Sequence, residues 1–333
     1  MATNKTENPS LRKDKIKQIL IDILPLAALG VLFAALCLTV QSKGYRLDMY
    51  LRIVFNEGVV LAVVATGAVF IYTLGSFDIS LGASTLFSAT LGVMAYNATN
   101  SLPIMILVIF GAAIGCSLLS SVLASVFHIP VFVTTVAMMS VLSAIAAQII
   151  SINGGALGGI SIPAELVQPL DNVPFKIVML AVFCVICFFI FDYTKIGRRL
   201  KFLGGNSVCA QLTGIQINRY AIIAFVIAGT GVGLGAFLTL VYTPSVTATT
   251  AGSIGMNILV AIVFGGMPIS GGPRSRIYSA LVGGFSYILL NNILKIIIDS
   301  NAGYGISQIV SAVFFLAVVY VTGLNYRTKV LPR

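Results

Sequence analysis

The side chains of this chain that could carry chemistry are few and widely spaced. There are ten carboxylates and one histidine, His128, among 333 residues. Carriers driven by a proton or sodium gradient usually hold an acidic side chain inside a membrane span, whereas the carboxylates here fall between apolar runs or at their ends. A metal site needs several converging donors, and His128 stands alone beside Pro130. The sequence therefore predicts no metal site and no cofactor bound by this chain.

The groups of an ATPase or a hydrolytic enzyme are also missing. The chain contains no G-x-x-x-x-G-K-[ST] loop for nucleotide phosphates, so we do not expect it to hydrolyse ATP. Cys184 and Cys187 form a C-x-x-C, but it lies inside an apolar run without a second pair. We therefore expect a transport subunit rather than an enzyme. An ion-coupled secondary transporter of a small polar solute is the alternative, because carbonyl and hydroxyl oxygens can also hold sodium.

Small hydroxyl and amide side chains are the polar groups that the apolar runs do contain. Such groups hydrogen-bond to hydroxylated solutes and equally to neighbouring helices. The candidates for lining a solute pathway are Thr66, Ser88, Thr134, Thr135, Gln148, Asn257, Asn291 and Asn292. Three G-x-x-x-G patterns, which start at Gly111, Gly229 and Gly231, predict close helix packing.

The elements that must position these side chains are membrane helices. Hydrophobic residues make up 58% of the chain and charged residues 9%, with a mean hydropathy of +1.03, whereas a soluble domain carries about 25% charged residues. We therefore predict an all-α, polytopic integral membrane protein with about ten transmembrane helices. The run 254–267 is too short for an unbroken crossing of about 17–25 residues, so we expect a short or broken helix there. The expected spans are 20–40, 54–74, 79–97, 102–126, 131–151, 174–192, 219–241, 254–267, 276–298 and 304–323.

Basic residues indicate the orientation of these spans. Lys and Arg number 20 against ten acids, for a net charge of +10. If the N-terminus is cytoplasmic and there are ten crossings, the basic residues favour the cytoplasmic side by about three to one, as the positive-inside bias requires. The bias predicts that both termini are cytoplasmic, and it explains the basic excess without a nucleic-acid partner. The expected organisation is a basic segment 1–19, a single transmembrane domain 20–323 and a tail 324–333.

One cytoplasmic segment, 193–218, is unusually long and mixes basic with apolar residues. Gly204–Gly205 and Gly214 divide it into short pieces. This pattern favours a short amphipathic helix that docks into another protein over a plain connector.

Three motifs resemble the permease subunits of sugar-importing ABC transporters. This family includes ribose, galactose, xylose and autoinducer-2 permeases and is distantly similar to branched-chain amino-acid permeases. The stretch LGSFDISLG, with Asp78, Ser80 and Gly82, resembles the family's G-G-I-D-L-S-V-G turn. GRRLKFLGGN and the following AQLTGI are similar to the family's cytoplasmic G-x-N…A-x-x-x-G-I loop. GGMPISGG, followed by paired glycines and paired asparagines, is similar to its third motif. The chain departs from the family at Ser76–Phe77 and at residues 273–276, where Pro-Arg-Ser-Arg stands.

The resemblance covers most of residues 54–323 and implies a function. A member of this family forms the translocation pathway for a monosaccharide or similar hydroxylated solute by alternating access in a prokaryotic cell membrane. The implied partners are cytoplasmic ATP-binding subunits that hold ATP and Mg²⁺, a second permease copy or paralogue, and an extracytoplasmic solute-binding protein, all at the lipid bilayer. By the same resemblance, the residues of the loop that couples to the ATPase are Gly204, Gly205, Asn206, Ala210, Gly214 and Ile215.

Overall fold

The computed structural model describes residues 9–154, 158–250, 254–268 and 270–298, together with six single positions between 309 and 320. Side chains are described from residue 23 onward. The expected last span, 304–323, lies mostly outside the described residues, which include six of its positions, and the tail 324–333 lies wholly outside them.

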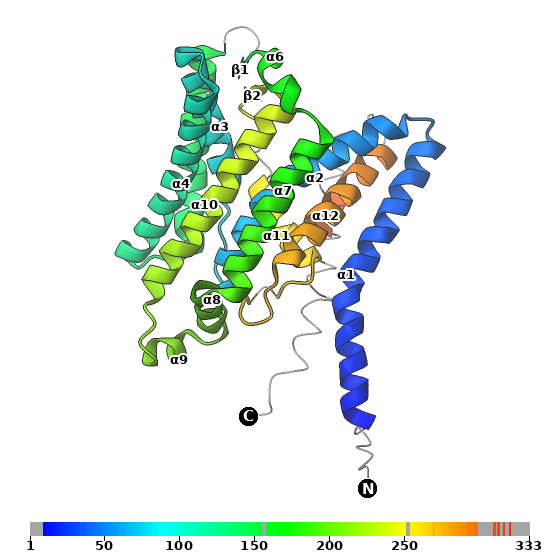
Figure 1. Ribbon diagram of the computed structural model, residues 1–333, viewed down its shortest axis with the longest axis vertical. Coiled ribbons are helices and arrows are strands. Elements are labelled where there is room, and N and C mark those ends of the chain that lie inside the picture. Colours follow the sequence, from blue (N-terminus) through cyan, green and yellow to red (C-terminus); the bar gives the residue numbers. More distant parts are fainter. Residues whose placement is uncertain are drawn as a thin grey trace.

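Helices account for nearly all of the described chain, and each expected span between 20 and 298 coincides with one of them (Figure 1). Two short strands, β1 (Gly159–Ser161) and β2 (Ser245–Thr247), pair antiparallel. The long helices are α1 (Pro9–Ser42), α2 (Leu47–Thr73), α3 (Leu81–Thr99), α4 (Leu102–Phe127), α5 (Val131–Asn153), α7 (Val173–Phe188), α10 (Ile217–Tyr242) and α12 (Ile277–Ile297), and α11 (Ile254–Phe264) has 11 residues. The shorter ones are α6 (Ala164–Val167), the 3₁₀ turn η2 (Gln168–Leu170), the π-helical segment η3 (Phe189–Tyr193), α8 (Lys195–Gly205) and α9 (Ser207–Leu212).

Seven described helices are long and apolar enough to cross a membrane. They are α1 from Ile23, α2, α4, α5, α7 together with η3, α10 and α12. The helix α11 is a shorter apolar helix, as expected for the run 254–267. These helices make the chain an all-α, polytopic membrane protein.

Local sequence signals set several helix ends. Asn100 and His128 adopt left-handed backbone conformations, with φ of 50° and 53°, and end α3 and α4. His128 is exposed, as a loop residue would be. At the start of α7, the side chain of Asn172 accepts a hydrogen bond from the N–H of Phe175 at 2.8 Å, which satisfies one of the unpaired N–H groups of the first turn.

The core lies around α2 and α10. In the most apolar window of α2, 83% of residues are buried, against 11% in α1. A Cβ atom added at Gly229 would lie 2.9 Å from the backbone of Ile114 in α4, and one at Gly231 would lie 3.3 Å from Gly67 in α2. The two G-x-x-x-G patterns of α10 therefore pack closely, as predicted.

The third G-x-x-x-G pattern behaves differently. A Cβ atom added at Gly111 or at Gly115 would meet no heavy atom within 4 Å among the described residues. The predicted close packing at this pair is therefore wrong within the described part of the chain. The difference arises because α10 is enclosed by α2 and α4, whereas this stretch of α4 faces outward.

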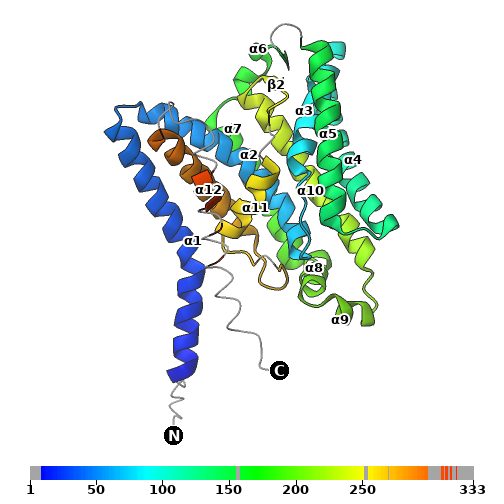
Figure 2. The same cartoon turned by 180° about the vertical axis from the view of Figure 1, so that it is seen from behind.

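The two ends of the bundle carry different elements. Figures 1 and 2 show β1, β2, α6 and the turn from α1 to α2 at one end, and α8 and α9 at the other. The first residues of α1 lie at the same end as α8 and α9, beyond the rest of the bundle. Within the described chain, α1 packs mainly against α12.

Candidate functional site

The segment 193–218 forms two short helices at one end of the bundle (Figure 1). The hydroxyl of Thr194 accepts a hydrogen bond from the N–H of Ile196 at 3.2 Å and begins α8. The side chain of Asn206 accepts one from the N–H of Cys209 at 3.0 Å and begins α9. The break between the two pieces therefore falls at Asn206, whose amide caps the second helix.

The glycines of this segment serve two different purposes. Gly204 and Gly205 lie in the last turn of α8 rather than in a turn after it. A Cβ atom added at Gly204 would lie 1.8 Å from the carbonyl oxygen of Thr73, at the end of α2, so only glycine permits this approach. Gly214 instead has a φ of +80° with open space around it, and so allows the chain to turn toward α10.

The end of α8 also contacts the loop before α12. A Cβ atom at Gly204 would lie 2.9 Å from the backbone nitrogen of Gly272, whose N–H donates to the carbonyl of Thr73 at 2.8 Å. A Cβ atom added at Gly205 would lie 3.2 Å from the ring of Pro273. The second and third sequence motifs therefore meet at the C-terminal end of α2.

The outward surface of α8 and α9 is apolar and basic. The exposed fractions of Phe202, Val208 and Leu212 are 42%, 65% and 84%. Arg198 is exposed beside them, whereas Ala210 is fully buried and Ile215 is partly buried against the core. Apolar side chains that protrude at the end of a membrane helical bundle are suited to contact another protein. We call Phe202, Val208 and Leu212 the α8–α9 surface.

The motif turn before α3 is buried. One carboxylate oxygen of Asp78 accepts hydrogen bonds from the N–H and the hydroxyl of Ser80, at 2.8 and 2.6 Å. The Asp78 side chain thus bonds to the N-cap residue of α3 rather than to the helix itself. A Cβ atom at Gly255 in α11 would lie 2.2 Å from the carbonyl of Ile79 and 3.5 Å from the nitrogen of Gly82. This turn therefore holds α3 and α11 together.

The candidate pathway residues do not converge on one site. Thr66 is fully buried and donates to the carbonyl of Ala62 at 2.7 Å. Gln148 is exposed on α5. Thr135 is buried and within 3.1 Å of the carbonyl of Phe132. The hydroxyls of Ser88 and Thr134 are buried and have no hydrogen-bond partner among the described residues.

The three asparagines lie closer together, between α2, α11 and α12. The hydroxyl of Tyr287 donates to Asn257 at 2.8 Å and contacts Asn291 at 3.5 Å. Asn292 donates to the carboxylate of Glu57 at 3.1 Å. These amides therefore link three helices through side-chain hydrogen bonds.

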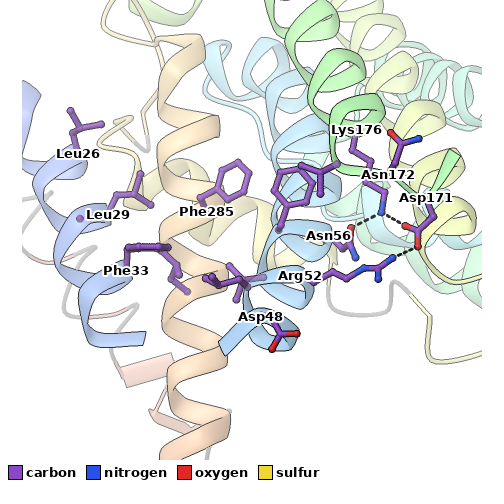
Figure 3. A pocket seen from close by; sticks show the side chains of 16 residues that line it. Leu26, Leu29, Phe33, Asp48, Arg52, Asn56, Asp171, Asn172, Lys176 and Phe285 are labelled. Atoms are coloured by element: carbon purple, nitrogen blue, oxygen red, sulfur yellow. Dashed lines mark hydrogen bonds and ion pairs between the residues drawn. The ribbon is translucent and has the colours of Figure 1, made fainter. Parts of the chain in front are cut away.

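A cluster of charged residues was missed by the sequence reasoning. Lys176 of α7 is 3% exposed, donates to the side chain of Asn56 in α2 at 2.6 Å and pairs with Asp171. Arg52 pairs with the other carboxylate oxygen of Asp171 at 2.7 Å (Figure 3). A lysine within the first turn of an apolar run, five residues after an aspartate, is the one signal that could have indicated it. Among the described residues no group of three or more His, Cys, Asp or Glu side chains could hold a metal ion.

Comparison with known proteins identifies the family. A family model described as a branched-chain amino acid transport system permease component matches residues 50–322. The chain belongs to this permease family. It is therefore the permease subunit of an ABC importer, a transport component rather than an enzyme, and a multi-pass inner-membrane protein.

Three relatives are named as permeases for ribose or L-arabinose. The chain is 25% identical over 305 residues to the ribose import permease protein RbsC of Haemophilus influenzae, covering 89% of this chain and 91% of that protein. It is 24% identical over 325 residues to RbsC of Escherichia coli K12, covering 95% and 98%. It is 28% identical over 265 residues to the L-arabinose ABC transporter permease protein AraH of Azospirillum brasilense, covering 76% and 74%. Permeases of this family associate with an ATPase and a solute-binding protein.

Proposed function

We propose that this permease forms the membrane pathway for a monosaccharide or a similar hydroxylated solute. ATP hydrolysis on a separate cytoplasmic subunit, which also holds the Mg²⁺, drives the change between outward-open and inward-open states. A solute-binding protein delivers the solute, and a second permease copy or paralogue completes the pathway.

The observation that carries this proposal is the α8–α9 surface together with its attachment. Phe202, Val208 and Leu212 offer apolar side chains to a partner, while the backbone of Gly204 contacts the end of the buried helix α2. A protein that presses on α8 therefore acts on the core of the bundle. This is the property required of a permease whose energy source is another subunit.

The solute class rests on the relatives and on the polar groups of the bundle. Relatives named for ribose and L-arabinose handle small, uncharged and highly hydroxylated solutes. Hydroxyl and amide side chains can exchange hydrogen bonds with such solutes without the cost of burying a charge. Asn257, Asn291 and Tyr287, which are hydrogen-bonded to one another, are the groups we assign to this role.

We also propose ten crossings with both termini in the cytoplasm. The start of α1 and the basic helix α8 lie at the same end of the bundle. A cytoplasmic N-terminus therefore places the α8–α9 surface in the cytoplasm, where an ATPase can reach it. The last crossing would be the apolar run 304–323.

Leu212→Asp tests the proposal, because it adds a charge to the α8–α9 surface at a side chain that is 84% exposed. The chain is purified in mild detergent with its associated proteins, and ATP-dependent solute uptake is measured in proteoliposomes. We expect Leu212→Asp to lose the co-purifying ATPase and to lower uptake at least tenfold. Tyr45→Asp, an exposed position at the opposite end, is the matched control and keeps both.

Two results would overturn the proposed function. One is full ATPase binding and uptake by Leu212→Asp at normal expression. The other is solute uptake by the chain alone under a proton or sodium gradient, which would establish the ion-coupled alternative.

A further inference from the structure

A groove of about 1020 Å³ runs between α1 and the body of the bundle (Figure 3). Apolar side chains of α1 form one wall, and apolar side chains of α2 and α12 form the other. Leu26 and Phe33 on the α1 wall are 60% and 49% exposed, so the described side chains do not fill the space. The apolar residues that line it include Leu26, Leu29, Phe33, Val54, Phe285 and Leu289.

One end of this groove is polar. Arg52, Asn56, Asp171 and Lys176 line it where α2 and α7 begin (Figure 3). The Lys176 ammonium is buried and already bonded to Asn56 and Asp171. The Arg52 side chain is 64% exposed and pairs with Asp171. A guanidinium has five N–H donors, so Arg52 retains donors for a ligand.

The charge at this end is positive. Two cations, Arg52 and Lys176, share one anion, Asp171. Asp48 also lines the groove, and its carboxylate pairs with the Arg46 guanidinium at 2.7 Å, so these two charges cancel. An anionic group is therefore favoured at the polar end of a groove whose other lining is apolar.

We propose that this groove binds a membrane phospholipid, with an acyl chain along α1 and the phosphate on Arg52. Bulk lipid tails are as apolar as the groove walls, so burial of an acyl chain alone gives no selectivity. The charge-assisted hydrogen bond to the phosphate must supply the selectivity, as in other basic sites between membrane helices. A sugar would leave its hydroxyls unpaired against these walls, so the groove is distinct from the proposed solute pathway.

The chain contains no tryptophan, so a single introduced tryptophan reports on the groove without background. Phe33→Trp in the full-length chain places the reporter on the α1 wall. Phe132→Trp on α5, at a side chain with a similar exposed fraction of 51%, is the control reporter. Fluorescence in detergent micelles is titrated with phosphatidylglycerol brominated on its acyl chains, and separately with diacylglycerol brominated in the same way.

We expect saturable quenching at Phe33→Trp, with half-saturation at a mole fraction of phosphatidylglycerol about tenfold lower than that of diacylglycerol. At Phe132→Trp we expect only quenching in proportion to the mole fraction. Arg52→Ala should remove the preference for phosphatidylglycerol, whereas the double variant Arg46→Ala/Asp48→Ala, which removes a neutral pair, should keep it.

Gly30 offers an independent variant, because it lines the groove and an added Cβ would meet no atom of the described residues within 4 Å. Gly30→Leu should obstruct the path of the acyl chain along α1 and abolish the saturable quenching. Gly111→Leu adds the same volume to an equally open position on α4 and should leave the quenching intact. Proportional quenching at Phe33→Trp, or saturable quenching that survives both Arg52→Ala and Gly30→Leu, would overturn the proposal. Neither quenching result depends on solute uptake, so the lipid site and the proposed function are tested independently.

Discussion

Gly204 and Gly205 are adjacent glycines in the same helical turn, and the structure predicts opposite effects when each is replaced by alanine. A Cβ atom at Gly204 would lie 1.8 Å from the carbonyl oxygen of Thr73, whereas one at Gly205 would lie 3.2 Å from the Pro273 ring. The first contact is with backbone and requires α8 to move away from α2 by more than 1 Å to reach about 3.5 Å, an ordinary separation of non-bonded atoms. The second contact needs a shift of only a few tenths of an ångström.

The size of the difference follows from two opposing contributions. Alanine in a helix is favoured over glycine by about 1 kcal/mol. Overpacking against an immobile neighbour costs about 1–3 kcal/mol, and sometimes more. We therefore expect Gly205→Ala to be neutral or to stabilise the permease by up to about 1 kcal/mol. Gly204→Ala should destabilise it by up to about 2 kcal/mol or, if α8 detaches, leave the rest of the fold intact and uncouple transport.

Thermal unfolding of the detergent-solubilised chain measures this difference, because three of its free cysteines are buried. Cys116, Cys184 and Cys187 react with a fluorogenic maleimide only as the helices separate, and the exposed Cys209 and the partly buried Cys37 supply the background. ATP-driven uptake in proteoliposomes is measured alongside. Equal unfolding temperatures and equal uptake for Gly204→Ala and Gly205→Ala would refute the close contact between α8 and α2.

Two further predictions concern the charged cluster and the cap of α9. Lys176→Met should destabilise the fold by about 1–3 kcal/mol, because Asn56 loses its partner and Asp171 keeps only the exposed Arg52. The same maleimide assay measures the unfolding temperature, which the added change Asp171→Asn should restore. An unchanged unfolding temperature for Lys176→Met would contradict the cluster. Asn206→Ala removes the cap of α9 and should weaken that helix by about 0.5–2 kcal/mol. We expect faster amide hydrogen exchange than in the wild type at Cys209 and Ala210, and unaltered exchange in α10. Exchange identical to the wild type at these two residues would exclude the capping role.

The helices were predictable because their signals are local. An apolar run of about 20 residues that ends at proline, asparagine or charge gives a span with bounds close to those of the structure, as for 131–151 and α5 (Val131–Asn153). The family motifs were equally visible, because each is a short string. The length of 254–267 also predicted a short helix, and α11 has 11 residues.

The contacts between helices were not predictable, because they depend on residues far apart in the chain. Gly111 and Gly229 begin the same G-x-x-x-G pattern, yet one faces open space and the other α4. Lys176 and Asn56 are 120 positions apart, and only the fold brings them together. The sequence predicted that Gly204 allows a turn, whereas in the structure its lack of a side chain allows α8 to approach the end of α2.

At Thr73, three segments contact one another directly through their backbones: α8, the end of α2 and the loop before α12. Gly204, Gly271 and Gly272 approach the end of α2 backbone to backbone, and a Cβ at Gly271 would lie 2.5 Å from the carbonyls of both Tyr72 and Thr73. Where side chains separate two elements, rotamer changes on the picosecond to nanosecond scale can absorb a small displacement. Here the backbones approach one another without an intervening side chain, so we expect α8, α2 and the loop before α12 to move together and a displacement of α8 to reach the C-terminal end of α2.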